Sequence, residues 1–285
     1  MTAGRSPGPA QAGPGVHVES GGGKDGPLVV FLHGSAASAA VWKPVTRRLA
    51  DRRPGTRWLL ADLPGHGRSR WQLDYSPDGY AAMVAAAIRG HLDGLRGPRP
   101  PVHLVGHSLG AMVALAVADG TRGVSVASVL AIAMKVNWTE EQLTRRAAAA
   151  SRPTRIFPSP EQARDLFGRV SGIAAAGPSA GFTEADLAGG VTGADGRHRL
   201  SGDPRITAAP PLTPAALAAL AARVTCPITP ACGDRDPGVR AEEMAEVFGR
   251  PVTVLPGAGH NAHIEHPGLI ADLVGQALGR AASDH

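Results

Sequence analysis

Short apolar runs recur along the chain, and each of them ends in glycine, proline or a polar turn. They occupy residues 28–32, 58–61, 102–105, 124–134, 228–232 and 252–255. Runs of this length between such breakers are typical of strands that are buried on both faces of a parallel sheet. The pattern therefore predicts a strand in each run.

Between these runs, apolar residues return at helical spacing. Such stripes cover residues 80–95, 109–117 and 269–278, and Pro267 is well suited to the first turn of the last one. Alternating strands and helices predict an α/β fold with a mostly parallel central sheet and helices on both of its faces.

The middle of the chain departs from this alternation. Residues 135–211 contain no convincing strand, but Thr139, Ser159 and Thr183 each precede acidic or amide residues in the manner of a helix N-cap. Residues 189–202 are rich in Gly and Arg and are predicted to form a loop. The sequence thus predicts an insertion of helices and loops between two strands of the sheet.

A chain of 285 residues is long enough for one large domain, or for one domain with an inserted part. Residues 1–15 consist mainly of Gly, Pro, Ala and Ser without an apolar stretch, which predicts a disordered leader and not a signal peptide. No apolar run approaches the ~20 residues of a membrane span. We therefore expect a cytoplasmic protein without a membrane partner.

The net charge and the two cysteines bear on the partners and the compartment of the protein. The formal net charge is +5, but the arginines are scattered and lack interleaved aromatic residues, which does not favour a nucleic-acid partner. Cys226 and Cys232 flank one predicted strand, about 20 Å apart. A disulfide needs Cα atoms within about 7 Å, so these two should not pair, as is typical of a reducing interior.

The pattern Gly-x-Ser-x-Gly occurs three times, around Ser6, Ser108 and Ser179. Among 37 glycines the pattern by itself says little, because its meaning depends on a strand before it and a helix after it. Ser6 lies in the predicted leader, and Ser179 has neither neighbour. Only Ser108 lies between an apolar run and an apolar helix.

A serine on a sharp strand-to-helix turn takes a strained backbone with positive φ. The residues two positions away on each side come so close that both must be glycine, as Gly106 and Gly110 are. The first N–H groups of the helix and its positive dipole end then face an oxyanion. The alternative is an ordinary tight turn of an α/β protein.

A nucleophilic serine needs a base within hydrogen-bond reach and a group that orients this base. Among the eleven histidines, His260 stands on a glycine-rich loop directly after the last predicted strand, at the sheet edge where ligands bind. Asp234 and Asp236 both follow the preceding strand. From the residues alone, either carboxylate could orient His260.

Five segments, each directly after a predicted strand, together resemble the α/β-hydrolase family from about Val16 onward. They are the oxyanion-loop motif at 33–34, D-x-x-G-x-G-x-S at 62–69, the nucleophile elbow at 106–110, the G-x-x-D acid loop at 233–236 and G-x-G-H at 257–260. The order Ser, Asp, His along the chain also agrees with this family. The resemblance implies a core of residues 16–134 and 212–285, with residues 135–211 as a helical cap.

Carried over residue by residue, the resemblance implies that Ser108 attacks a carbonyl carbon, His260 transfers the proton and Asp236 fixes the imidazole tautomer. The backbone N–H groups of Ser35 and Leu109 would form the oxyanion hole. The resemblance implies no cofactor.

The remaining aromatic and polar candidates have less specific roles. The aromatic residues of the predicted cap could line the substrate pocket or pack the cap's own core; they are Trp138, Phe157, Phe167 and Phe182. Structural roles in loops, turns and helix starts are expected for His33, Asp62, His66, His103, His107, His263 and His266. No cluster has metal-ligand spacing, so no metal site is predicted.

These observations predict a cofactor-free serine hydrolase that acts on a small carbonyl substrate such as an ester, lactone, thioester or amide. A serine at the elbow does not fit the dehalogenase and epoxide-hydrolase members, which use a carboxylate there. Lyase, C–C hydrolase and perhydrolase members share the same three residues and stay open as possibilities. A non-catalytic ligand-binding protein is the alternative from a different class. The sequence leaves the oligomeric state open.

Overall fold

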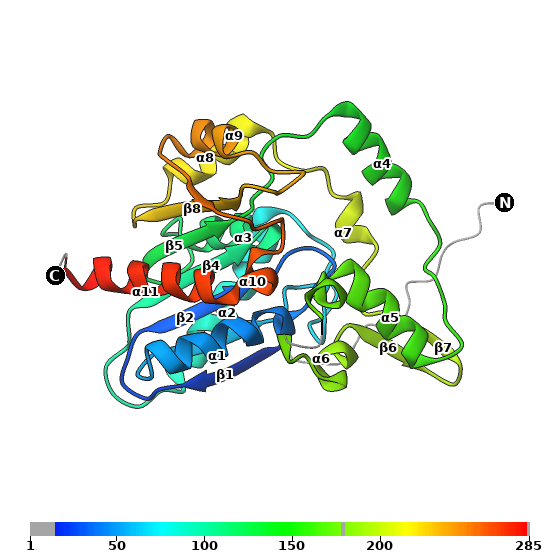
Figure 1. Cartoon of the computed structure of the whole chain (residues 1–285), viewed down its shortest axis with the longest axis horizontal. Helices are drawn as coiled ribbons and strands as arrows, with labels where there is room; N and C mark the ends of the chain where they lie inside the picture. The colour runs from blue at the N-terminus through cyan, green and yellow to red at the C-terminus, as the bar shows by residue number, and fades with distance from the viewer. Residues whose placement is uncertain (1–14, 178–179, 284–285) are drawn as a thin grey trace.

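The computed structural model describes residues 15–177 and 180–283 (Figure 1). Its main sheet has the strand order β1-β3-β2-β4-β5-β8-β9. The strands are β1 (Val18–Gly22), β3 (Arg57–Ala61), β2 (Leu28–Leu32), β4 (Val102–His107), β5 (Val126–Ile132), β8 (Ile228–Gly233) and β9 (Thr253–Leu255). Only β1, which pairs with β3, is antiparallel among these pairings. The predicted mostly parallel sheet is confirmed, and β1 was missed because its sequence lacks an apolar run.

Strand β2 shows why the apolar runs are continuous. All five of its residues are fully buried, with Leu28, Val30 and Leu32 packed in one hydrophobic layer and Val29 and Phe31 in the other. Successive side chains of a strand point to opposite faces, so a strand covered on both faces must be apolar throughout.

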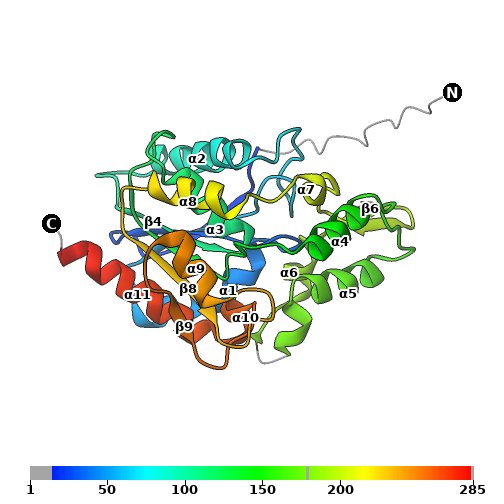
Figure 2. The ribbon, with the colours of Figure 1, turned by 90° about the horizontal axis from the view of Figure 1, so that it is seen from above.

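Helices cover both faces of the sheet, as predicted (Figure 2). One layer contains α2 (Pro77–Asp93), α3 (Leu109–Val117), α8 (Pro214–Ala222) and α9 (Ala241–Phe248). The other contains α1 (Lys43–Arg52), α10 (Ala262–Glu265) and α11 (Pro267–Ser283), together with the short 3₁₀ turn η1 (Ala39–Trp42).

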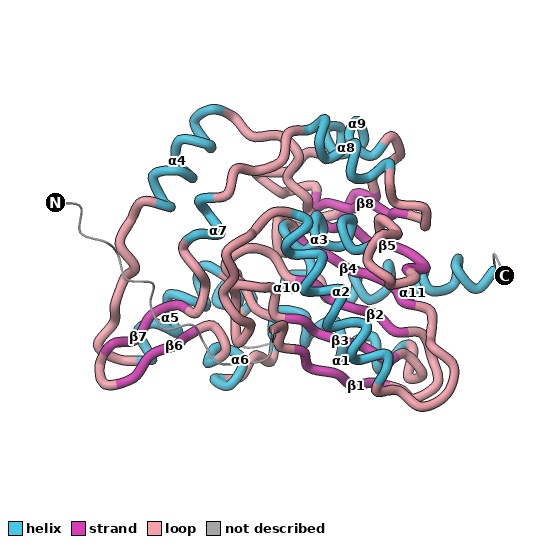
Figure 3. Tube along the Cα trace, turned by 180° about the vertical axis from the view of Figure 1, so that it is seen from behind, coloured by secondary structure: helices cyan, strands magenta, loops and turns pink. Residues whose placement is uncertain are grey.

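The intervening segment, which is the described part of residues 135–211, lies beside one end of the main sheet (Figure 3). The segment holds α4 (Glu140–Ala150), α5 (Pro160–Val170), η2 (Ile173–Ala176), α6 (Glu184–Ala188), β6 (Val191–Ala194), β7 (Arg197–Leu200) and α7 (Arg205–Ala208). Thr139, Ser159 and Thr183 each accept a hydrogen bond from the backbone N–H three residues on. The three predicted helix starts are therefore confirmed.

The prediction of a loop over residues 189–202 was wrong, because β6 and β7 form an antiparallel hairpin there. Asp195 and Gly196 make its two-residue turn with φ of +51° and +70°, which is the backbone that an Asp-Gly hairpin turn favours. The flanking strands lack an alternation of apolar and polar residues, so the Asp195-Gly196 dipeptide was the only sequence signal for the hairpin.

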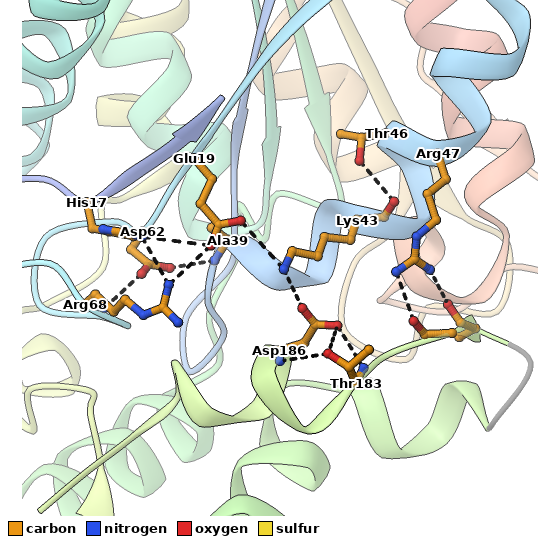
Figure 4. Close-up of polar contacts among 12 residues, drawn as sticks. His17, Glu19, Ala39, Lys43, Thr46, Arg47, Asp62, Arg68, Thr183 and Asp186 are labelled. Carbon is orange, nitrogen blue, oxygen red and sulfur yellow. Dashed lines mark hydrogen bonds and ion pairs between the residues drawn. The ribbon is translucent and has the colours of Figure 1, made fainter. Parts of the chain in front are cut away.

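The intervening segment is tied to the core by an ion pair between a partly exposed lysine and a buried carboxylate (Figure 4). Lys43 of α1 donates to the Asp186 carboxylate of α6, which also accepts the backbone N–H of Thr183. The Asp186 side chain is 2% exposed. Arg47 adds hydrogen bonds to the backbone carbonyl oxygens of residues 180 and 181.

Three sequence expectations concern features outside this architecture. The predicted leader lies outside the described residues except for Gly15, and so does Ser179. Cys226 and Cys232 are both free thiols, as expected from their separation. None of the helices in the described ranges is both long and apolar enough to cross a membrane.

Candidate active site

Ser108 lies at the sharp turn from β4 into α3, with φ of +51° and ψ of −112°. This positive φ is the strain expected of a serine held up from the sheet between a strand and a helix. The backbone N–H of Ser108 donates to the carbonyl oxygen of Ile132 at 2.8 Å, which ties the turn to β5.

The two glycines around Ser108 are required by the packing. A Cβ atom at Gly106 would lie 2.2 Å from the carbonyl oxygen of Gly110. At Gly110, a Cβ atom would lie 2.2 Å from the carbonyl oxygen of Leu32. Both obstacles are backbone atoms, so no side chain fits at either position, and the sequence argument for this pair is confirmed.

His260 and Asp236 form a hydrogen-bonded pair on the loops after β9 and β8. His260 Nδ1 lies 2.7 Å from Asp236 Oδ2, and the Asp236 side chain is 1% exposed. A carboxylate only accepts, so Nδ1 carries the proton and Nε2 is left as an acceptor. Burial raises the pKa of Asp236, but the hydrogen bonds from His260 and the backbone outweigh burial and lower that pKa.

Asp234, the other carboxylate candidate, has a different partner. Its Oδ1 accepts the backbone N–H of Gly257 at 2.8 Å on the exposed surface. Asp234 therefore braces the loop that carries His260 and does not touch the imidazole. Glu265, which the sequence reasoning missed, braces the same loop by accepting the N–H groups of Gly259 and Asn261. The five-residue spacing from His260 to Glu265 was the available signal.

Buried histidines fix the loops on either side of Ser108. His33 Nε2 accepts the N–H of Leu63 at 2.9 Å, so its Nδ1–H donates to the carbonyl oxygen of Gly34 at 2.7 Å. Burial lowers the pKa of His33 to about 4 and keeps the ring neutral. His107 donates from Nε2 to the carbonyl oxygen of His260 at 2.9 Å. Burial, followed by the charge of His260, lowers the pKa of His107 to about 3.

The other predicted structural residues also occupy loops and packing positions. Asp62 accepts the N–H groups of Ala39 and Arg68, at 2.7 and 2.8 Å (Figure 4), which holds the turn after β3. The four remaining histidines each contact a neighbouring group: His66 contacts Pro64, His103 contacts Ser128, His263 packs on the rings of Trp42 and His107, and His266 contacts Gly257.

Ser35 and Leu109 line the same cavity as Ser108. Gly34 lets the chain before Ser35 come close to Ser108, because a Cβ atom there would lie 2.7 Å from His107 Nδ1 and 3.3 Å from Ser108 Cβ. Within the part of the chain that the structure describes, neither the Ser35 nor the Leu109 backbone N–H donates to another group. Two free donors beside a serine suit a developing negative charge.

Ser108, His260, Ser35 and Leu109 all line one cavity of about 780 Å³. Strands β2 and β4 are neighbours, but the strand that follows β2 in the chain, β3, lies on one side of them, and the strand that follows β4, β5, lies on the other. The cavity lies at this reversal of strand order, which is where α/β sheets bind ligands. Its wall is predominantly apolar and is completed by residues of the intervening segment. These are Lys135, Trp138, Arg146, Arg205, Ile206 and residues 208–211.

Of the four aromatic candidates, only Trp138 lines this cavity. Phe157 and Phe167 are buried, and Phe182 is partly buried against the hydrophobic layer that contains α1 and α11. The structure thus places the three phenylalanines in packing positions. Among residues 15–177 and 180–283, no group of three or more His, Cys, Asp or Glu side chains is arranged to hold a metal ion.

Fold and site together define a class: an α/β sheet with a serine at a strained elbow and an Asp–His pair on the following strand ends. A model of the alpha/beta hydrolase family matches residues 29–273. The chain belongs to this family, which confirms the resemblance seen in the sequence. As a member of this family it is classed as an enzyme, and the named relatives include esterases and other hydrolases.

Among curated relatives, pimeloyl-[acyl-carrier protein] methyl ester esterase of Methylococcus capsulatus is 41% identical over 101 residues, 35% of this chain and 34% of that protein. The chain thus matches about a third of the length of the first such relatives. A longer match is 2-succinyl-6-hydroxy-2,4-cyclohexadiene-1-carboxylate synthase of Yersinia pseudotuberculosis. It is 28% identical over 266 residues, 87% of this chain and 86% of that protein.

Solved structures of the same fold cover nearly the whole chain. E-2-(acetamidomethylene)succinate hydrolase superposes with a TM-score of 0.71 at 24% identity, over 93% of this chain and 95% of that one. The Mycobacterium tuberculosis esterase Rv0045c superposes with a TM-score of 0.67 at 25% identity, over 94% and 93%.

Proposed function

We propose that this protein is a cofactor-free serine hydrolase that cleaves an ester, or a related lactone, thioester or amide, through an acyl-enzyme on Ser108. One observation carries the proposal. Ser108, on its strained turn, shares a cavity with His260, whose Nδ1 is held by the buried Asp236. Esterases among the curated relatives are in keeping with this chemistry.

In the proposed reaction, His260 Nε2 accepts the hydroxyl proton as Ser108 Oγ attacks the carbonyl carbon. The Asp236 carboxylate stabilises the imidazolium that forms, and it stays ionised because its pKa is lowered. The N–H groups of Ser35 and Leu109 bind the oxyanion, and each such donor is typically worth ~10²–10³ in rate. His260 then protonates the leaving group, and water cleaves the acyl-enzyme.

We assign residues 135–211 the role of a cap. Trp138 and the stretch around α7 supply one wall of the cavity that contains Ser108. Closing a site in this way excludes bulk water and strengthens the electrostatic interactions within it.

A fluorophosphonate probe tests the proposal, because it phosphonylates only an activated serine. We expect the wild-type protein to be labelled and Ser108→Ala to stay unlabelled. Absence of labelling in a folded wild-type protein would refute the proposed mechanism.

A second candidate is elimination, in which His260 removes a carbon-bound proton, the electron pair of that C–H bond forms a C=C bond, and a leaving group departs from the adjacent carbon with its bonding electrons, so that no acyl-enzyme forms. The relative with the longer match is named a synthase and not a hydrolase, which makes a non-hydrolytic reaction at the same residues the second candidate. Rapid quenching with a chromogenic ester separates the two candidates. An acyl group on Ser108, detected by mass spectrometry, supports the hydrolase, and an unsaturated product formed without any acyl group on Ser108 supports elimination.

A further inference from the structure

Two cations in the wall of the cavity have no carboxylate partner. Lys135 follows β5, and Arg146 lies on α4, which packs beside α7 (Figure 1). In the portion of the chain that the structure covers, neither forms an ion pair. Arg205, a third cation of the wall, is by contrast paired with Asp203 through both carboxylate oxygens.

Neutral groups hold the two cations in place. Arg146 donates to the backbone carbonyl oxygens of Ile206 and Ala209, at 2.9 and 3.1 Å. Lys135 Nζ donates to the carbonyl oxygen of Gly238 at 2.8 Å. Carbonyl oxygens position a cation but leave its charge uncompensated, so the arrangement keeps two oriented positive charges at the cavity.

Trp138 joins the two cations into one group, which we call the Lys135–Trp138–Arg146 cluster. Lys135 Nζ lies 5.2 Å and the Arg146 guanidinium carbon 5.6 Å from the centre of the Trp138 ring. Both distances are within the range of cation–π attraction. Charges at the wall of a protein cavity interact more strongly with an anion inside it than they would in bulk water.

The cluster lies close to the proposed catalytic residues through the Asp236 loop. Gly238, which accepts from Lys135, donates its own N–H to Asp236 Oδ1 at 2.8 Å. Among the described residues that line the same cavity, only Asp74 has a carboxylate, and it is exposed and already accepts two hydrogen bonds from Ser76. The lining charges therefore sum to a positive cavity, whose wall also holds apolar side chains and uncharged polar ones such as Tyr75 and Tyr80.

Resting on the proposed hydrolase function, we propose that the substrate carries a carboxylate, which the Lys135–Trp138–Arg146 cluster binds while Ser108 faces the scissile bond. A substrate of this class has an apolar stretch that fills the cavity and an anionic group at a distance from the ester. Lys135 and Arg146 are both partly buried, charged side chains removed from water are usually paired, and the substrate carboxylate would be their partner.

Matched ester pairs test this inference and locate the carboxylate. On the acyl side, mono-4-nitrophenyl adipate is compared with its neutral methyl ester. On the alcohol side, 4-carboxyphenyl hexanoate is compared with its methyl ester. We expect the charged member of one pair to be cleaved with the higher kcat/KM, and that pair identifies the side of the ester that carries the anion. Equal or lower kcat/KM for the charged member in both pairs would overturn the inference.

Variants assign the preference to the cluster. Arg146→Met and Lys135→Met should each lower the charged-to-neutral kcat/KM ratio about 10- to 100-fold, the scale of one charge-assisted hydrogen bond. Arg145→Met is the matched control on the same helix, because Arg145 is exposed and pairs with Glu141. An unchanged ratio in both cluster variants would also overturn the inference.

A binding arm separates this inference from the proposed function. Calorimetric titration of Ser108→Ala with monomethyl adipate and with dimethyl adipate needs no turnover. Tighter binding of the monoester that is lost in Ser108→Ala/Arg146→Met supports the anion site even if no ester is cleaved. Equal binding of both, in a protein that does cleave esters, refutes the anion site and leaves the hydrolase standing.

Discussion

Replacing Asp236 by asparagine is the sharpest test of the proposed acid–base pair, because its contacts fix how an amide would sit there. Oδ1 accepts the backbone N–H groups of Gly238 and Val239, at 2.8 and 3.1 Å. Oδ2 lies 2.7 Å from His260 Nδ1. In Asp236→Asn, the amide oxygen must stay toward the two N–H donors, so the NH₂ group takes the place of Oδ2.

An NH₂ group at this position is a donor that faces Nδ1. His260 then carries its proton on Nε2, the tautomer that cannot accept the proton of Ser108. The same exchange in a serine protease, with geometry intact, lowers kcat about 10⁴-fold. We expect a loss on that scale for Asp236→Asn, which corresponds to about 5.4 kcal/mol of transition-state stabilisation.

The assay is the hydrolysis of a 4-nitrophenyl ester, with kcat and KM measured separately. Asp234→Asn is the matched control, since it makes the same chemical change two residues away, at a carboxylate that accepts only the Gly257 N–H in the described contacts. We expect a small loss in this control. If Asp234→Asn slows turnover as much as Asp236→Asn, while both variants keep the wild-type circular dichroism, the assignment of Asp236 is wrong.

Three further predictions concern packing, anchoring and loop position. Gly110→Ala puts a methyl group 2.2 Å from a β2 carbonyl oxygen and should lower the free energy of unfolding by about 3 kcal/mol or more. Gly90→Ala in α2 meets nothing within 4 Å and should raise it by about 0.5–1 kcal/mol; urea titrations showing equal effects would contradict the packing argument. Lys43→Met should lower the stability at pH 7 by about 1–3 kcal/mol. Burial raises the pKa of Asp186, but the hydrogen bonds from Lys43 and from the N-cap threonine of α6 outweigh it and lower that pKa. The contribution is therefore complete above the ordinary Asp pKa of about 4 and is lost as the pH falls through the folded-state pKa. The melting temperatures of wild type and variant should converge in acid, and a constant difference down to pH 2 would count against the ion pair. Glu265→Ala frees two N–H groups of the His260 loop and should reduce kcat roughly 10- to 100-fold with little change in KM; an unchanged kcat would show that the loop holds its shape without this carboxylate.

Local patterns in the sequence determined most of the core. The continuous apolar run at 28–32 predicted a strand covered on both faces, and all five residues are fully buried. Gly106 and Gly110 predicted the strained turn at Ser108, and for Gly106 the obstacle to a side chain is the carbonyl oxygen of Gly110, four positions on. The obstacle at Gly110 is a carbonyl oxygen of β2, which only the folded sheet brings there. The apolar run and the contact at Gly106 depend on neighbours along the chain, so a single sequence contains them.

The hairpin of β6 and β7 could not be predicted from hydrophobic periodicity. Its strands carry no apolar face, so no periodicity marked them, and only Asp195-Gly196 indicated a turn. The antiparallel strand β1 was missed for the same reason, because its sequence has no apolar run and its strand conformation depends on backbone pairing with β3.

Tertiary contacts decided the details of the candidate site. Position after a strand did not distinguish Asp234 from Asp236, and only the family resemblance favoured Asp236; the folded loops bring Asp236 to His260 and Asp234 to Gly257. The same holds for the cavity wall, where Trp138 faces the cavity and Phe157 is buried elsewhere. The sequence shows which residues directly follow a strand. Contacts between residues on separate loops depend on how those loops pack against each other, and only the packing of the whole chain determines this.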